Sequence, residues 1–151
     1  MNLVELKLEE LVNYVNDDPV RPELSAEFRV SAGKKVYALK SDDTVLSILC
    51  VAFIRKIPQT TDDLNDEENA GELVICPYTI WTYKAGAGRK LLNSVMTMLE
   101  EKYKDVPTGY KPRIVTLSPK TEIAHKFHTN NGATVLRENA TTVNYEYSVK
   151  R

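Results

Sequence analysis

The sequence has few cysteines and no long apolar run. Its two cysteines, Cys50 and Cys76, lie within apolar segments, and neither is part of a CxxC motif. Zinc and thiol redox sites usually need such paired ligands, so we expect two structural thiols and no metal site. No segment approaches the roughly 20 consecutive apolar residues of a membrane helix. These absences favour an ordinary globular protein, with one domain over residues 1–151 and no membrane partner.

The chain also lacks a large net charge of either sign. Its 20 Lys and Arg oppose 21 Asp and Glu, which gives a formal net charge of -1. Nucleic-acid-binding domains usually carry a concentrated basic excess, so we expect no nucleic-acid partner. Residues 1–10 are rich in Glu and lack the basic and apolar regions of a secretory signal, which predicts a cytoplasmic protein.

The apolar pattern predicts alternating helices and strands. Val4, Leu8 and Leu11 recur at helical spacing, which predicts an amphipathic first helix that ends at Asp17-Asp18-Pro19. A second, short helix is expected within 21–32, and a long helix is expected after Gly88. A further helix should run from about 119 to 130, with Ser118 as N-cap and Gly132 as terminator. Segments rich in β-branched residues predict strands at 36–39, 44–57, 72–78, 113–117, 134–137 and 143–149.

An acidic segment separates the second and third of these strands. Residues 58–71 carry almost nothing apolar, which predicts a loop that does not pack. Its carboxylates, within 62–68, would either attract a cationic amine or simply be solvated.

A glycine-containing turn joins the third predicted strand to a long helix. Gly86 and Gly88 would let main-chain N–H groups at the helix start approach a phosphate closely. Lys84, Arg89 and Lys90 add positive charge there. The alternative is a tight turn with surface cations. The Lys-Ser or Lys-Thr of a P-loop is absent, and Leu91 stands where a dinucleotide fingerprint needs glycine.

Two motifs together resemble the GNAT superfamily of N-acetyltransferases. The segment 83–88, Tyr-Lys-Ala-Gly-Ala-Gly, is similar to its acyl-CoA signature, Gln/Arg-x-x-Gly-x-Gly/Ala, with Tyr83 at the Gln/Arg position. Residues 121–133 are similar to its fourth-helix motif, Asn-x-x-Ala-x-x-Leu-Tyr-x-x-x-Gly-Phe. Here Ala124 and Gly132 match, while Thr121, Phe127, His128 and Ala133 replace Asn, Leu, Tyr and Phe.

The resemblance implies a fold and a cosubstrate. The fold class would be α/β (α+β), with a mixed, mostly antiparallel sheet flanked by helices and splayed central strands that form a cleft for CoA. The superfamily's first strand, which normally precedes the first helix, is not evident at this N-terminus. Acetyl-CoA would be the acyl donor, and the cleft would be lined by Ile75, Cys76, Pro77, Tyr78 and Trp81. The expected cofactor-binding residues are Cys76, Tyr78, Tyr83, Lys84, Ala85, Gly86, Ala87, Gly88, Arg89, Lys90 and Thr121.

Acyl transfer to an amine needs a group that removes a proton. Glu72, at the start of the third predicted strand, lies eleven residues before Tyr83, an offset similar to that of the base in histone-type members of the superfamily. The alternative is a solvent-facing glutamate. His128 stands where the superfamily usually has an acid tyrosine and would protonate the departing thiolate, or else be a structural histidine. His125 is expected at the surface, and Cys76 is not expected to carry the acyl group.

The resemblance predicts an enzyme that transfers an acetyl group directly from acetyl-CoA to a primary amine of a small molecule or protein. The rival is a catalytically degenerate module that binds a protein partner, because the substitutions at Tyr83, Thr121, His128 and Ala133 accumulate at motif positions. The acceptor and the oligomeric state stay open, a homodimer included.

Overall fold

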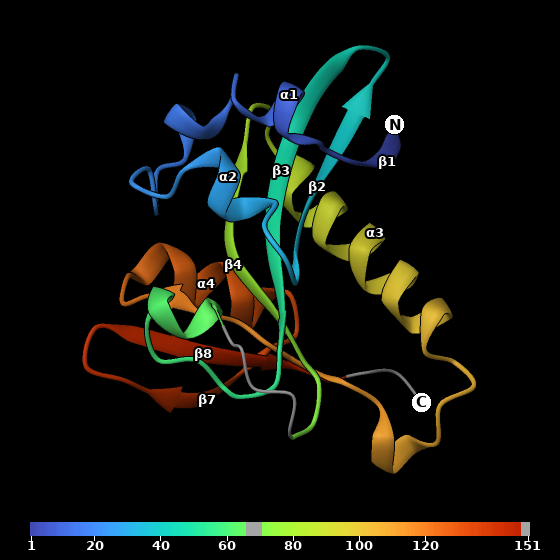
Figure 1. Cartoon of the computed structure of the whole chain (residues 1–151), viewed down its shortest axis with the longest axis vertical. Helices are drawn as coiled ribbons and strands as arrows, with labels where there is room; N and C mark the ends of the chain where they lie inside the picture. The colour runs from blue at the N-terminus through green and yellow to red at the C-terminus, as the bar shows by residue number, and fades with distance from the viewer. Residues whose placement is uncertain (66–70, 149–151) are drawn as a thin grey trace. The chain divides into compact units, whose positions relative to one another are not determined.

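The computed structural model describes residues 1–65 and 71–148 (Figure 1). The chain packs as two compact units, described separately below. The first consists of Met1–Val51 and Thr79–Leu99, and the second of Ala52–Tyr78 and Glu100–Arg151. The strands β3 (Thr44–Ile54) and β4 (Val74–Thr82) each contribute residues to both units.

The first unit begins with a strand where a helix was expected. β1 (Asn2–Glu5) pairs antiparallel with β2 (Lys34–Ser41), with Leu3 opposite Leu39. The predicted helix over the N-terminus is therefore wrong in its first turn, and the first strand that seemed to be missing is present. Residues 2–5 are half-buried at most, and their main-chain groups gain partners from β2.

The helices of the first unit are short except for one. α1 (Leu8–Leu11) and the 3₁₀ turn η1 (Val15–Asp17) replace the long predicted helix, and α2 (Ala26–Arg29) lies within the expected segment. Ser25 caps α2, because its Oγ accepts the Phe28 N–H at 3.0 Å. α3 (Ala87–Lys102) confirms the predicted long helix, seen at full length in Figure 1. It buries Leu91, Leu92, Val95 and Leu99.

The second unit contains the remaining strands. β5 (Arg113–Val115) pairs parallel with the start of β4, and β8 (Thr142–Tyr147) pairs antiparallel with β5, with β6 (Ser118–Pro119) and with β7 (Thr134–Glu138). A 3₁₀ turn, η3 (Thr108–Tyr110), precedes β5.

The last helix begins later than expected. α4 spans Glu122–Asn130, and its N-cap is Thr121, whose Oγ1 accepts the Ala124 N–H at 3.2 Å. Ser118 is not the cap because it lies in a strand and its hydroxyl bonds elsewhere. Gly132, with φ 97°, follows the helix end as predicted.

The acidic segment is only partly a loop. η2 (Thr61–Leu64) forms within it, and Leu64 is 2% exposed, so the expectation that nothing there packs is wrong for this residue. Residues 66–70, which include Asp66, Glu67 and Glu68, lie outside the described residues.

The strands form one mixed, mostly antiparallel sheet with hydrogen-bonded order β1-β2-β3-β4-β5-β8-β6, and β7 pairs with β8. Together with the helices, this confirms the predicted fold class. Among the described residues no helix has both the length and the apolar character needed to cross a membrane.

Candidate functional site

The turn before α3 takes a conformation that requires glycine. Gly86 has φ 81°, in the left-handed region that other residues rarely adopt. A Cβ placed there would meet no atom within 4 Å, so the surface beside Gly86 is open. The turn is fixed to β3, because the buried Ser47 hydroxyl donates to the Ala87 carbonyl at 2.9 Å. A fixed turn with an open outer surface is suited to close approach by a ligand.

Several main-chain donors of this turn are unused. The N–H groups of Ala85, Gly86, Gly88 and Arg89 have no hydrogen-bond partner within the described part of the chain. Tyr83 differs, because its N–H donates to the Leu46 carbonyl at 2.8 Å. Unpaired N–H groups at the positive end of a helix dipole bind anions. The turn can therefore hold a phosphate group through its backbone.

Three cationic side chains flank the same turn. Lys84, Arg89 and Lys90 are exposed, and none forms an ion pair with another described residue. Their charge adds to that of the helix terminus, which favours a polyanion over a neutral ligand. The turn thus brings together the main-chain and side-chain donors that the sequence predicted.

The Tyr83 side chain is hydrogen-bonded to other residues of the protein. Its hydroxyl accepts from Trp81 Nε1 at 2.9 Å and donates to Asp17 Oδ2 at 2.7 Å. Partial burial raises the pKa of Tyr83 to about 12, although the Trp81 hydrogen bond opposes the rise. At the position of the usual Gln or Arg, this chain therefore has a neutral hydroxyl that joins the segment before α2 to β4.

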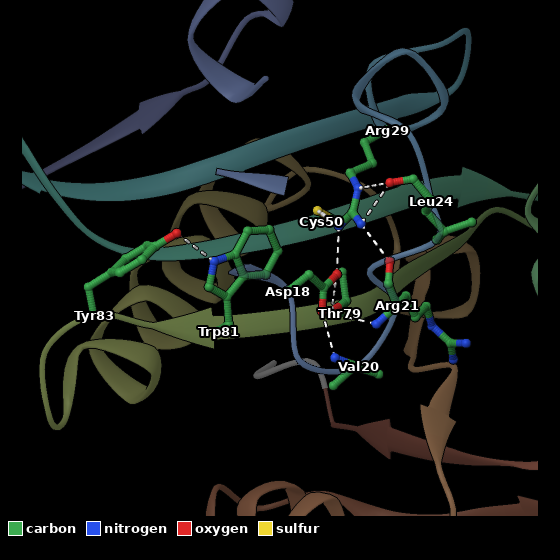
Figure 2. Close-up of polar contacts among 9 residues, drawn as sticks. All are labelled: Asp18, Val20, Arg21, Leu24, Arg29, Cys50, Thr79, Trp81 and Tyr83. Atoms are coloured by element: carbon green, nitrogen blue, oxygen red, sulfur yellow. Dashed lines mark hydrogen bonds and ion pairs between the residues drawn. The ribbon is translucent and has the colours of Figure 1, made fainter. Parts of the chain in front are cut away.

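A buried ion pair fixes that same segment (Figure 2). Arg29 Nη1 donates to Asp18 Oδ2 at 2.7 Å, and both side chains are fully buried. Thr79, on β4, donates to the same carboxylate at 2.9 Å. The guanidinium also donates to the carbonyls of Leu24 and Arg21. All strong hydrogen-bonding groups of the pair have partners, which offsets the cost of burying two charges.

The residues expected to line a cleft are mostly buried. Ile75, Cys76 and Tyr78 are each at most 2% exposed, and Trp81 is 5% exposed, with the Arg29 guanidinium 5.5 Å from its ring centre. Neither Cys50 nor Cys76 forms a disulfide, and both are buried. The parallel ladder with β5 covers only Val74 and Ile75, and Leu117 N donates to the Pro77 carbonyl further along.

Glu72 lies outside the strand that it was expected to open. Gly71, just before it, has φ 107°, and β4 begins only at Val74. Glu72 is exposed and lines a surface cavity of about 440 Å³ together with Lys111, Arg113 and Glu146. The sequence predicted the residue but neither its position before the strand nor its neighbours.

His128 is buried among hydroxyl groups and aromatic rings. Its Nε2 lies 3.1 Å from Ser118 Oγ, its Nδ1 lies 2.7 Å from the Tyr147 hydroxyl, and its ring stacks on Tyr145. Burial lowers the pKa of His128 to about 4, so the ring is neutral at pH 7. A neutral imidazole ring is too weak an acid to protonate a thiolate. This geometry favours the structural alternative over the acid role expected for His128.

The hydroxyl partners of the helix were missed at the level of sequence. Tyr147 bonds His128, and Tyr145, two residues earlier on the same strand face, lies with its hydroxyl 3.2 Å from Nδ1 of the exposed His125. The sequence does contain a signal for these two contacts. It has two tyrosines at strand spacing and two histidines at helical spacing, as expected where a strand packs against a helix.

The remaining expected ligands have structural partners. Thr121 uses its hydroxyl as the cap of α4. Asp63 of the acidic segment accepts the N–H groups of Gln59 and Thr60, and these bonds lower its pKa, with help from Lys56. Among the described residues, no group of three or more His, Cys, Asp or Glu is arranged to hold a metal ion.

Comparisons by sequence found nothing: no family model and no curated protein matches. Solved structures do match. PaiA N-acetyltransferase from Thermoplasma acidophilum, in complex with coenzyme A, is 12% identical with a TM-score of 0.64, over 98% of this chain and 99% of that one. A structure from Desulfovibrio desulfuricans assigned to the GNAT family of acetyltransferases is 16% identical with a TM-score of 0.64, over 99% of both chains. The chain has the GNAT fold.

A longer protein with a different named activity also matches this chain in structure. Malonyl-CoA decarboxylase from Cupriavidus metallidurans is 16% identical with a TM-score of 0.67, over 97% of this chain. The chain spans 60% of the length of that decarboxylase. The fold is therefore compatible with more than one reaction of an acyl-CoA, and the chemistry has to be argued from this chain's own residues.

Proposed function

We propose that this protein is an N-acetyltransferase that transfers an acetyl group from acetyl-CoA directly to a primary amine. The observation that carries the proposal is the turn before α3. It combines a glycine at φ 81°, four unpaired N–H groups and three unpaired cations at one helix start. The GNAT fold supports the choice of a CoA thioester over other anions.

The turn would hold the diphosphate of CoA. The N–H groups of Ala85, Gly86, Gly88 and Arg89 would donate to its oxygens, and the Lys84, Arg89 and Lys90 side chains would add charge-assisted hydrogen bonds. Ala87 and the two glycines beside it carry no bulky side chain that would block the diphosphate. Thr121, at the exposed start of α4, is proposed as a further contact for the rest of the cofactor, whereas Cys76 and Tyr78 of β4 are buried and offer it no surface in this structure.

Proton removal from the amine is assigned to Glu72, directly or through water. An alkyl amine with a pKa near 10.4 is mostly protonated at pH 7, so it must lose a proton before or during attack on the thioester. Glu72 is an exposed carboxylate that lines a cavity, so an amine can reach it. Main-chain N–H groups of β4 are proposed to stabilise the oxyanion.

Departure of the CoA thiolate needs no cationic acid in this proposal. A thiol has a pKa of roughly 8.5, so the sulfur can take its proton from solvent. His128 then acts as a positioning residue in its neutral form, because it orders the hydroxyls of Ser118 and Tyr147. A turnover rate that depends on protonated His128, with loss of activity above pH 4–5, would restore the acid role.

Titration calorimetry with acetyl-CoA tests the proposal, followed by detection of free CoA thiol across a panel of amines. We expect binding at tens of micromolar or tighter, and at least tenfold weaker binding in the variant Lys84→Met/Arg89→Gln/Lys90→Met. The control Lys7→Met removes an exposed lysine between β1 and α1, and this variant should bind acetyl-CoA as the wild type does. No binding by the wild type would support the rival, a GNAT-fold module that acts by contact with a protein partner.

A further inference from the structure

A second feature of the molecule is the cavity beside Glu72. It has a volume of about 440 Å³ and opens at the surface of the second unit, between η3, the start of β5 and the end of β8. This volume falls within the range of about 300–1,000 Å³ that is typical of small-molecule sites. A cavity of this size suits a metabolite.

The ionisable residues of the cavity carry no net charge. Glu72 and Glu146 oppose Lys111 and Arg113. Arg113 and Glu146 neutralise one another in a bidentate pair, with Nε and Nη2 each 2.8 Å from a carboxylate oxygen. A strongly cationic ligand would meet Arg113 and Lys111, and an anionic one would meet the two carboxylates. A ligand with both charges avoids either penalty.

The two cationic residues of the cavity keep unused donors for a carboxylate. Arg113 uses two of its donors on Glu146, and a guanidinium has about five in all. Lys111 Nζ donates to the carbonyls of Tyr103 and Lys104 at 3.2 and 3.4 Å, which leaves one of its roughly three donors. These groups can bind a carboxylate without breaking any bond of the protein.

An acceptor for an ammonium group lies near these donors. Glu72 forms no side-chain hydrogen bond or ion pair with another described residue, and the Arg113 N–H donates to the neighbouring Leu73 carbonyl at 3.2 Å. Hydroxyls of Thr108, Thr134 and Ser148 line the remainder of the cavity. The lining therefore offers a carboxylate that interacts with Arg113 through charge alone, spare cationic donors and neutral hydroxyls.

We propose that this cavity binds a free α-amino acid with a small or polar side chain, its ammonium group at Glu72 and its carboxylate at Arg113 and Lys111. The inference rests on the proposed function in one respect: because Glu72 is the proposed base, the bound amino acid would be the acetyl acceptor. The binding itself does not depend on acetyl transfer.

The experiment measures binding to the whole chain by NMR or calorimetry, first with the twenty L-amino acids and then with two analogues of the tightest ligand. One analogue is the amine that lacks the carboxylate, and the other is the acid that lacks the amine. We expect at least tenfold weaker binding for each. The inference is overturned if no amino acid binds, or if either analogue binds as tightly as the parent.

Variants locate the site on the same protein. Glu72→Gln and Lys111→Met should each weaken binding of the amino acid at least tenfold, while Glu9→Gln and Lys7→Met, exposed residues of the first unit, should not. Unchanged binding by Glu72→Gln and Lys111→Met would place the ligand elsewhere and overturn the inference.

Acetyl-CoA tests separate the two proposals. If acetyl-CoA binds and amines are acetylated but no amino acid binds, the proposed function survives and the amino-acid inference fails. If amino acids bind through Glu72 but acetyl-CoA does not bind, the cavity assignment stands and the proposed function fails.

Discussion

His128 shows how the setting of one residue decides its chemistry. The same histidine in water would be half protonated near pH 6.5 and would be a useful acid at pH 7. Within the second unit it is 8% exposed, and its pKa is about 4. Neither Ser118 nor Tyr147 supplies a charge that would favour the protonated ring. Position in a motif therefore identified the residue but not its protonation state.

The lowered pKa predicts a pH-dependent stability. The native state disfavours protonated His128, so its contribution is fully present above pH 6.5 and is lost as pH falls towards 4. At pH 5 the loss should be about 2 kcal/mol of unfolding free energy relative to pH 7.5. Urea denaturation at both values measures it. The His128→Gln variant should lose this part of the pH dependence, whereas His125→Gln should keep it, and equal slopes in the two variants would contradict the assignment.

Buried charges were the residues hardest to foresee. Asp18 was expected to end a helix, and Arg29 falls within the segment 21–32 that was expected to form the second helix, yet the two form the buried ion pair that Thr79 completes. Local sequence patterns report solvent exposure on average, and charged residues are almost never fully buried unless they are paired. Only the pairing across eleven positions explains their burial, and that pairing is tertiary.

At the scale of elements, the turn before α3 can be tested by glycine substitution. Gly86 and Gly132 have φ of 81° and 97°, whereas Gly109 has no positive φ, and a Cβ would meet open space at all three. Gly86→Ala and Gly132→Ala should each lose about 1–2 kcal/mol of unfolding free energy, because L-residues are strained in this region. Gly109→Ala should lose less.

Ligand affinity then distinguishes the two strained glycines. Only Gly86→Ala should weaken acetyl-CoA binding, by about tenfold, since its methyl group would stand where the diphosphate approaches. Gly132 follows α4 and serves as the control for strain alone. Calorimetry gives both affinities, and equal affinities in the two variants would remove the turn from the proposed site.

Elements with a strong local signal were predictable, and those that depend on distant partners were not. α3 has six buried residues at helical spacing, and β3 is almost entirely buried, so periodicity identified both. β1 has only four residues, and its strand form depends on pairing with β2. Its apolar residues also fit a helical period, which explains why the N-terminus was predicted as a helix.

The same limit applies to the candidate site. Both glycines of the turn and its three cations follow each other in the sequence, so the turn that is proposed to bind an anion was visible in the spacing. The cavity beside Glu72 was not, because Lys111 directly follows η3, whereas Arg113 and Glu146 lie in β5 and β8. Their meeting depends on the parallel pairing of β4 with β5 and on the antiparallel pairing of β5 with β8.

At the scale of the whole molecule, salt should affect the proposed ligand binding more than it affects the stability of the fold. A net charge of -1 offers no long-range attraction for a polyanion, so any electrostatic attraction for the proposed ligand acetyl-CoA would come from the local cations of the turn. These side chains are exposed and are screened by salt, whose Debye length falls from about 10 Å at 0.1 M to about 3 Å at 1 M. The buried Asp18–Arg29 pair is screened much less.

Raising NaCl from 50 to 500 mM should therefore weaken acetyl-CoA binding several-fold, while the free energy of unfolding changes by less than about 1 kcal/mol. The variant Lys84→Met/Arg89→Gln/Lys90→Met should show a much smaller salt effect on binding, because the screened charges are gone and the main-chain donors remain. Calorimetry and urea denaturation in the same buffers provide both quantities. A salt dependence that is equal in the variant and the wild type would mean that the anion is held elsewhere on the molecule.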